Sequence, residues 1–186
     1  MSTKKLYKDK LEIPKNVQVE LDYNVIKVKG EKGEIQKKLN LPKIKIEKQD
    51  NIISFTSKYT SKREKRMVNT NKAHIKNMFK GVTEGFSYKL KICSGHFPMT
   101  VELKDKEIII KNFFGEKVPR KSKILDDVKV TINGDEILVE GIDKEKTGQT
   151  ATNLERATKI KNRDKRIFQD GIWITEKAGK PIRWQI

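Results

Sequence analysis

Residues 17–21 read VQVEL, and residues 99–103 read MTVEL, at an offset of 82 positions. At the same offset, VKGEKG at 28–33 aligns with IKNFFG at 110–115. Further along the chain, IKIEKQDNIISF from Ile44 aligns with VKVTINGDEILV from Val128, at an offset of 84. Three matches in the same order indicate an internal duplication. The sequence therefore predicts two similar halves.

Each half begins with short runs in which apolar and polar residues alternate, such as VQVEL and VIKVKG in the first half. This alternation is typical of antiparallel strands that have one buried face. Residues that favour turns separate the runs, at 22–24, 50–51 and 133–135. The runs therefore predict strands that are joined mostly by hairpins.

A helical pattern follows the strands in each half, because apolar and small residues recur there at a spacing of three or four. These residues are Met67, Val68, Asn71, Ile75, Met78, Phe79 and Val82, and then Ala151, Leu154, Ala157 and Thr158. We predict an α+β fold of two tandem similar domains, each an antiparallel β-sheet packed against one helix. The predicted domains are residues 1–83 and 84–176, followed by a basic tail at 177–186.

The chain of 186 residues is strongly basic, with a formal net charge of +17. Such a charge favours polyanionic partners, either a phosphate backbone or an anionic membrane. No apolar run approaches the ~20 residues that a membrane-spanning helix needs, and the N-terminus MSTKKLYKDK lacks the apolar core of a signal peptide. Cys93 is the only cysteine, which fits a reducing cytoplasm. We therefore expect a cytoplasmic protein with no membrane partner.

The charge is distributed unevenly along the chain. Basic residues outnumber acidic ones by 21 to 9 in residues 1–83 and by 9 to 3 in residues 156–186, whereas residues 84–155 hold 12 against 13. Only seven of the 42 basic residues are arginines, and four of these lie in the last 31 residues. The planar guanidinium suits phosphates and bases better than an ammonium group does. The C-terminal segment is therefore the main predicted RNA-binding region.

The predicted RNA-binding residues are the cations of this segment: Arg156, Lys159, Lys161, Arg163, Lys165, Arg166, Lys177, Lys180 and Arg183. We expect Asp170 and Gly171 to form a turn. The apolar residues Ile167, Phe168, Ile172 and Ile174 would dock the segment on the second domain, so that the cations on both sides meet RNA together. Trp173 is open between packing and base stacking. The structural alternative for the first cations is a favourable position at a helix C-terminus.

A second basic cluster lies in residues 58–76 and has only one acidic residue, Glu64. It contributes Lys62, Arg63 and Arg66 as secondary RNA-binding candidates. The alternative is a solvated outer face of a helix.

The sequence gives little support for catalysis. Cys93 and His96 are three positions apart and could be imagined as a nucleophile and its base. However, Cys93 lies in an alternating apolar run, which favours a small strand side chain. One cysteine and two distant histidines make a poor zinc site, and no phosphate-binding glycine motif is present. We predict no enzyme, no metal, no cofactor and no small-molecule substrate, and we keep an RNA-processing enzyme that uses Cys93 and His96 as the competing hypothesis.

The stretch RIFQDGIWI at 166–174, with Ile160 and Arg163 upstream and Lys177 downstream, resembles the C-terminal signature of the L6 family of large-subunit ribosomal proteins in its archaeal and eukaryotic form. Three more stretches agree with this family: MFKGVTEGF at 78–86, HFP at 96–98 and NFFGEK at 112–117. The resemblance covers about residues 11–180. The chain departs from the signature at Arg156, where glutamine is usual, and at Trp173, where tyrosine is usual.

The resemblance implies two similar α+β domains and a structural, non-catalytic protein of the cytoplasmic large ribosomal subunit. It implies rRNA contacts near the sarcin–ricin loop and the stalk base, made mainly by the second domain, with neighbouring ribosomal proteins as partners and translation factors nearby. By position, Arg163, Arg166 and Lys177 take the RNA-facing role and Gly171 the tight turn. From the residues alone, a free-standing structured-RNA-binding protein is the alternative.

Overall fold

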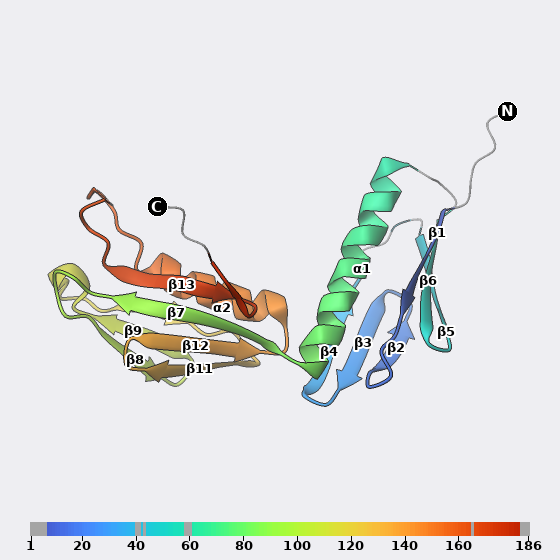
Figure 1. The fold of residues 1–186 in the computed structure, drawn as a ribbon, viewed down its shortest axis with the longest axis horizontal. Helices are drawn as coiled ribbons and strands as arrows, with labels where there is room; N and C mark the ends of the chain where they lie inside the picture. The colour runs from blue at the N-terminus through green and yellow to red at the C-terminus, as the bar shows by residue number, and fades with distance from the viewer. Residues whose placement is uncertain (1–6, 40–41, 43, 58–60, 165, 183–186) are drawn as a thin grey trace. The chain divides into compact units, whose positions relative to one another are not determined.

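A computed structural model describes residues 7–39, 42, 44–57, 61–164 and 166–182 of the chain. The chain divides into two compact units, Met1–Gly85 (unit 1) and Phe86–Ile186 (unit 2), as Figure 1 shows. The division falls two residues after the predicted boundary. Each unit contains antiparallel strands and one long helix. The predicted α+β fold of two tandem similar domains is therefore confirmed.

Unit 1 contains two three-stranded sheets, of order β1-β6-β5 and β2-β3-β4. Its elements are β1 (Tyr7–Glu12), β2 (Gln18–Asp22), β3 (Val25–Gly30), β4 (Gly33–Lys38), β5 (Ile44–Gln49), β6 (Ile52–Ser57) and α1 (Lys62–Thr83). Helix α1 packs against β3, β4 and β1. The predicted single sheet is thus two sheets, because β1 continues the β5–β6 hairpin and not the β2–β3 hairpin.

Helix α1 buries the face that the helical spacing predicted. Val68, Ile75 and Val82 are fully buried, and Met78 and Phe79 nearly so. The helix begins after Ser61, whose hydroxyl donates a hydrogen bond to the Glu64 carboxylate three positions later. A serine and a glutamate at this spacing are typical of a helix N-terminus.

Unit 2 repeats this plan and adds to it. Its sheets have the order β11-β12-β7-β13-β14 and β10-β9-β8. The elements are β7 (Phe86–Cys93), β8 (Thr100–Lys104), β9 (Glu107–Lys111), the short 3-10 turn η1 (Phe113–Gly115), β10 (Arg120–Lys123), β11 (Val128–Asn133), β12 (Glu136–Gly141), α2 (Lys144–Ala157), β13 (Gly171–Lys177) and β14 (Lys180–Pro181). Neither of the two long helices described is apolar enough to cross a membrane.

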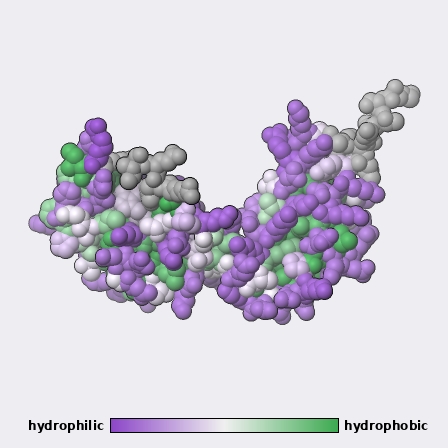
Figure 2. All heavy atoms as spheres, in the orientation of Figure 1, coloured by the Kyte–Doolittle hydropathy of each residue, from purple (hydrophilic) through white to green (hydrophobic). Residues whose placement is uncertain are grey.

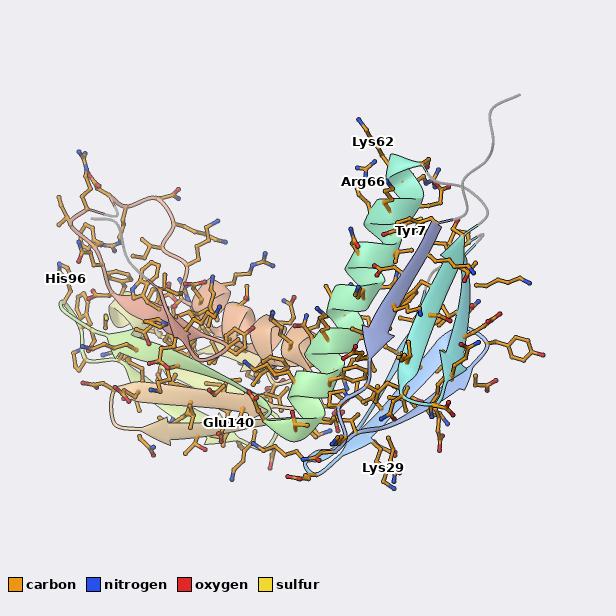
Figure 3. The ribbon with its side chains drawn as sticks, turned by 45° about the vertical axis from the view of Figure 1, so that its right-hand side comes forward. Tyr7, Lys29, Lys62, Arg66, His96 and Glu140 are labelled. Carbon is orange, nitrogen blue, oxygen red and sulfur yellow. The ribbon has the colours of Figure 1, made fainter. Side chains whose placement is uncertain are left out.

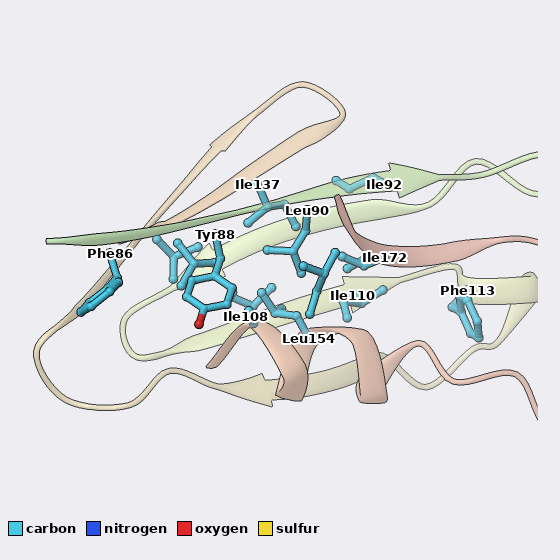
Figure 4. Close-up of a cluster of buried hydrophobic side chains, with 14 of the residues drawn as sticks. Phe86, Tyr88, Leu90, Ile92, Ile108, Ile110, Phe113, Ile137, Leu154 and Ile172 are labelled. Atoms are coloured by element: carbon cyan, nitrogen blue, oxygen red, sulfur yellow. The ribbon is translucent and has the colours of Figure 1, made fainter. Parts of the chain in front are cut away.

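The core of unit 2 lies between its sheets and α2, as Figure 4 shows. Leu90, Ile110, Ile137, Leu154 and Ile172 are all fully buried there. Burying one such side chain contributes about 1.5–3 kcal/mol to folding. Because Ile172 belongs to β13, the C-terminal segment is part of this core and is not an appendage.

The two units differ at one edge of the sheet. In unit 1 the strands β5, β6 and β1 correspond to β11, β12 and β7 in unit 2. In unit 2, β13 pairs with the other edge of β7, with Gly171 opposite Cys93 and Ile174 opposite Leu90. No described strand of unit 1 pairs with the corresponding edge of β1. The basic C-terminal segment therefore extends the duplicated fold, and residues 177–182 form the end of β13, a turn and β14 where the sequence suggested a tail.

Candidate nucleic-acid interface

The C-terminal segment leaves α2 and returns to the sheet at the same end of unit 2. Just after α2, the Thr158 hydroxyl accepts a hydrogen bond of 2.9 Å from the backbone N–H of Ile172 in β13. Between these two points, Ile160 is buried in the core. The described residues between these two points therefore form a loop whose ends are fixed. Four of the predicted RNA-binding cations belong to them: Lys159, Lys161, Arg163 and Arg166.

Arg163 is the centre of an aromatic cluster in this loop. Its guanidinium carbon lies 5.0 Å from the ring centre of Phe114 and 4.9 Å from that of Phe168. The His96 ring lies 4.9 Å from the Phe168 ring, centre to centre. We name Arg163, Phe114, Phe168, His96 and Asp170 the Arg163 cluster. A guanidinium is attracted to ring faces at these distances, so the rings hold the exposed Arg163 side chain in place.

The turn that supplies Phe114 has an unusual backbone. Asn112 and Phe114 have φ angles of 58° and 51°, in the left-handed region. This region is uncommon for asparagine and rare for a bulky side chain such as phenylalanine. The Asn112 amide donates a hydrogen bond of 2.9 Å to the Pro98 carbonyl, and Phe113 is buried in the core. Backbone strain that the surroundings fix in this way is frequent at binding sites.

Asp170 joins the loop to the segment that follows β7. One of its carboxylate oxygens accepts a hydrogen bond from the backbone N–H of Gly95, and the other lies 2.8 Å from Nδ1 of His96. The Asp170 side chain is only 8% exposed. The predicted turn residue therefore has a larger role, because it orients the His96 ring against Phe168. Figure 3 shows His96 at this end of unit 2.

The two arginines of the loop differ in how their charge is compensated. Among the described residues, Arg163 forms no ion pair with a carboxylate. Arg166 pairs with Asp164 at 3.0 Å, although its side chain is 89% exposed. The hydrogen bonds from Arg166 hold the pKa of Asp164 below its usual value. Arg163 therefore offers an uncompensated and pre-oriented charge, whereas a phosphate would have to compete with Asp164 for Arg166.

Three further candidates lie at the same end of unit 2. Arg156 in the last turn of α2, Lys159 and Lys161 are all exposed. The C-terminus of α2 is already bound by another cation, Arg120, which donates to the carbonyls of Ala157 and Lys159 at 2.9 and 3.3 Å. Arg120 therefore already supplies a favourable positive charge at the C-terminal end of the α2 dipole. This arrangement weakens the structural explanation for the exposed cations that follow α2.

Lys177 and Lys180 lie at the other end of β13. They face each other as a cross-strand pair in the β13–β14 hairpin, where two like charges destabilise the pairing. The turn between them has positive φ at Ala178 and Gly179, and the Gly179 N–H bonds to the Ser87 carbonyl at the start of β7. Nothing in the described fold requires two lysines at this position, which favours a binding role.

The structure does not bring the two sets of cations together as the sequence suggested. Gly171 begins β13 beside the loop and Lys177 ends it, so about 20 Å of strand separates the sets. The reason is that β13 lies beside β7 as an extended strand, as Figure 1 shows, with Gly171 opposite Cys93 and Glu176 opposite Lys89. Two predicted residues, Lys165 and Arg183, lie outside the part of the chain that the structure describes.

Not all of the apolar residues of the C-terminal segment are buried as predicted. Ile172 and Ile174 are buried as expected and Phe168 is half-buried, but Ile167 is 65% exposed and does not dock the loop. The N–H groups of Ile167 and Phe168 both bond to the Asp164 carbonyl, and this local turn directs Ile167 outward. Trp173 is half-buried, and its Nε1–H donates to the Gln169 carbonyl at 3.0 Å.

The remaining candidates are the basic cluster of unit 1 and the pair Cys93 and His96. Lys62, Arg63 and Arg66 lie in the first turns of α1 in unit 1 and are exposed. Cys93 is the last residue of β7 and lies opposite Gly171, while the Nδ1 atom of His96 is engaged by Asp170. In the described ranges, no group of three or more histidine, cysteine or carboxylate side chains could hold a metal ion.

A family model described as Ribosomal protein L6 matches residues 13–85 and 97–171, which covers most of both units. The chain belongs to the ribosomal protein L6 family. It is 47% identical to the large ribosomal subunit protein uL6 of Methanococcus vannielii over 95% of this chain and 97% of that protein. It is 45% identical to the protein of the same name from Methanobrevibacter smithii, over 91% of this chain and 96% of the relative.

As an L6 protein, the chain is a structural constituent of the large ribosomal subunit, located on the cytoplasmic ribosome, and it is not an enzyme. The sequence predicted each of these properties. Family membership also decides against the free-standing RNA-binding protein and against an enzyme that uses Cys93 and His96. The matched residues include the whole loop and end at Gly171, the first residue of β13.

Proposed function

We propose that this L6 protein binds large-subunit rRNA through the loop end of unit 2, near the sarcin–ricin loop and the stalk base. The observation that carries the proposal is the Arg163 cluster, in which an uncompensated guanidinium is held between two aromatic rings. Around it lie the exposed cations Arg156, Lys159, Lys161 and Arg166.

The geometry of the cluster suits a phosphate contact. A guanidinium stacked on rings keeps its N–H edges available, and those edges match two phosphate oxygens at once. Because the rings already fix Arg163, less side-chain entropy is lost when a phosphate binds. The half-buried Phe114 and Phe168 are packed against each other and against Arg163, so we assign them to positioning and not to base stacking.

We assign a second contact with rRNA to Lys177 and Lys180. Their pairing across the hairpin places two like charges side by side, and a phosphate between them would relieve the repulsion. The distance from the loop means that the two contacts would involve different phosphates along the RNA. Neighbouring ribosomal proteins and translation factors would meet the rest of the surface.

The test compares two sets of substitutions in the full chain. Changing Lys161, Arg163 and Arg166 to glutamine should weaken binding to an in vitro transcript of large-subunit rRNA and reduce the slope of log affinity against log salt by about two to three. Changing Lys177 and Lys180 to glutamine should reduce the slope by about one to two. Binding would be measured over a series of salt concentrations, with a thermal melt of each variant to verify folding.

The matched control removes the same charge elsewhere in unit 2. Lys104, Lys123 and Lys129 are exposed and lie outside the C-terminal segment. If their replacement by glutamine reduced affinity and salt slope as much as the loop substitutions do, binding would depend on net charge alone. The assignment of the loop end as the rRNA contact would then be wrong.

A further inference from the structure

We infer that unit 1 carries a second, separate RNA-binding site, in a groove between the end of β4 and the first half of α1. The groove has a volume of about 440 Å³. Its described lining residues are Lys37, Lys38, Arg63, Arg66, Met67, Thr70, Asn71 and His74. The class of ligand that we assign to it is the phosphodiester backbone of RNA. This inference goes beyond the contacts proposed for unit 2.

The groove collects positive charge from two elements that are distant in sequence. Lys37 and Lys38 come from β4, and Arg63 and Arg66 come from α1. No described lining residue is acidic. The nearest acidic residue along α1, Glu64, accepts a hydrogen bond from the Ser61 hydroxyl at the helix start. The described lining of the groove therefore holds four cationic side chains and no acidic one.

Helix energetics do not explain these cations. The first turns of a helix carry the positive end of its dipole, where Asp and Glu are stabilising and cations are not. Helix α1 nevertheless places Lys62, Arg63, Lys65 and Arg66 in its first two turns. Positive charge that the helix itself disfavours is expected where an anionic ligand compensates for it. Figure 3 shows Lys62 and Arg66 together at this end of unit 1.

The chemistry of the lining favours a phosphate backbone over an acidic protein. Met67 is the only apolar side chain among the described lining residues, whereas protein interfaces are usually built around buried aromatic or apolar anchors. The remaining lining side chains are hydrogen-bonding groups, including the exposed Thr70 hydroxyl and two guanidinium forks. Figure 2 shows mainly hydrophilic side chains over the visible face of unit 1. Forks and hydroxyls of this kind are typical of phosphate contacts.

One pair of groove residues is already organised. The Lys37 ammonium lies 3.3 Å from Nδ1 of His74. An ammonium group can only donate, so Nδ1 acts as the acceptor and the ring proton sits on Nε2. This contact joins β4 to α1 across the groove and orders two of its lining side chains.

The test uses the full chain and an in vitro transcript of large-subunit rRNA. Changing Lys38, Arg63 and Arg66 to glutamine should weaken binding about tenfold or more at low salt and reduce the salt slope by about two to three. The matched control changes Lys27, Lys29 and Lys45, which are exposed cations of unit 1 outside the groove. The control should alter the slope by less than one. Equal effects of the two triple substitutions would overturn the inference.

Direct contact between the groove and RNA can be tested by crosslinking, independently of affinity. A photoreactive p-benzoylphenylalanine in place of Thr70, which lines the groove, should crosslink to the transcript, and the same group in place of Lys29 should not. Failure of Thr70 to crosslink when Lys29 does would overturn the site. If the groove substitutions abolished binding of polyglutamate but left the RNA affinity and slope unchanged, the partner would be an acidic protein and the inference would be wrong.

The two proposals can fail separately. The groove substitutions would also be combined with glutamine at Lys161, Arg163 and Arg166. Effects of distant, independent sites add in free energy, so the two sets of fold-changes should multiply. If the unit 2 substitutions weakened rRNA binding and the groove substitutions did not, the proposed function would be retained and the groove rejected as an RNA site. The opposite pattern would retain the groove and reject the loop end.

Discussion

The Nδ1 atom of His96 lies 2.8 Å from a carboxylate oxygen of Asp170, 74 positions further along the chain. The same carboxylate also accepts the backbone N–H of Gly95. Through these two contacts Asp170 connects the segment after β7 with the loop that carries Arg163. The orientation of the Arg163 cluster therefore depends on one buried acid.

Replacing Asp170 with alanine should lower the free energy of unfolding by about 1.5–3 kcal/mol, the usual contribution of hydrogen bonds to a charged group. It should also weaken rRNA binding, because His96 and Phe168 lose their fixed positions. Urea denaturation and a filter-binding titration measure the two effects. Asp170→Asn retains an acceptor for the Gly95 N–H and should lower the free energy of unfolding by less. The control is Asp126→Ala, which removes an exposed carboxylate. If Asp170→Ala lowered the free energy of unfolding no more than this control does, the role assigned to Asp170 would be contradicted.

Gly171 begins β13 with a φ of 153°, a conformation that is almost restricted to glycine. A Cβ there would lie 3.4 Å from both the Thr158 hydroxyl and Nε1 of Trp173. Gly171→Ala should therefore cost about 1–3 kcal/mol of stability through backbone strain. The control is Gly134→Ala, where φ is 59° and a Cβ would meet nothing within 4 Å, and the expected cost is about 1 kcal/mol. Equal losses in denaturant unfolding would show that the Gly171 backbone is not specially constrained.

Much of the fold could be predicted from the sequence, because its signals are local. The alternation in VQVEL corresponds to β2, and the spacing of Val68, Ile75 and Val82 corresponds to the buried face of α1. The duplication is confirmed by the matching strand order of the two units. What the local pattern could not show is that each unit has two sheets, because strand order depends on pairing between residues that are distant in sequence.

The candidate site shows the same limit more clearly. The cations of the C-terminal segment are visible in the sequence, but their separation along β13 depends on its register with β7. Phe114 and His96 come from two other segments and join Arg163 only through tertiary packing. In the sequence, the HFP and NFFGEK stretches agree with the L6 family. Their contact with the loop could not be inferred from spacing.

The sequence leaves Trp173 open between packing and base stacking, and its environment in the structure favours packing. Its Nε1–H donates to the Gln169 carbonyl, and its ring lies against Gly171. Trp173→Phe should cost about 0.5–1.5 kcal/mol through the lost hydrogen bond and leave rRNA affinity unchanged. Thermal unfolding and RNA titration of the same variant separate these effects. A large loss of affinity with unchanged stability would instead assign Trp173 to an RNA contact.

The ion pair of Glu116 and Arg120 gives unit 2 a pH-dependent contribution to stability. The two side chains approach within 2.6 Å, and Arg120 also binds the carbonyl of Ala157 at the end of α2. Hydrogen bonds from Arg120 hold the pKa of Glu116 below its ordinary value of 4.5. For a carboxyl group with a lowered folded-state pKa, the stabilisation is complete above the unfolded-state pKa and disappears as the pH falls through the folded-state pKa.

Glu116→Gln should therefore lower the free energy of unfolding at about pH 7, and the difference from the unchanged chain should shrink as the pH falls below about 4.5. Because Glu116 is partly exposed, the effect should also decrease at high salt. Urea denaturation over a pH series measures the difference, and Glu34→Gln serves as the control because Glu34 is exposed in the other unit. A stability difference that stayed constant down to about pH 3 would mean that the Glu116 charge does not stabilise the end of α2. Arg120 would then hold the helix end without its carboxylate partner.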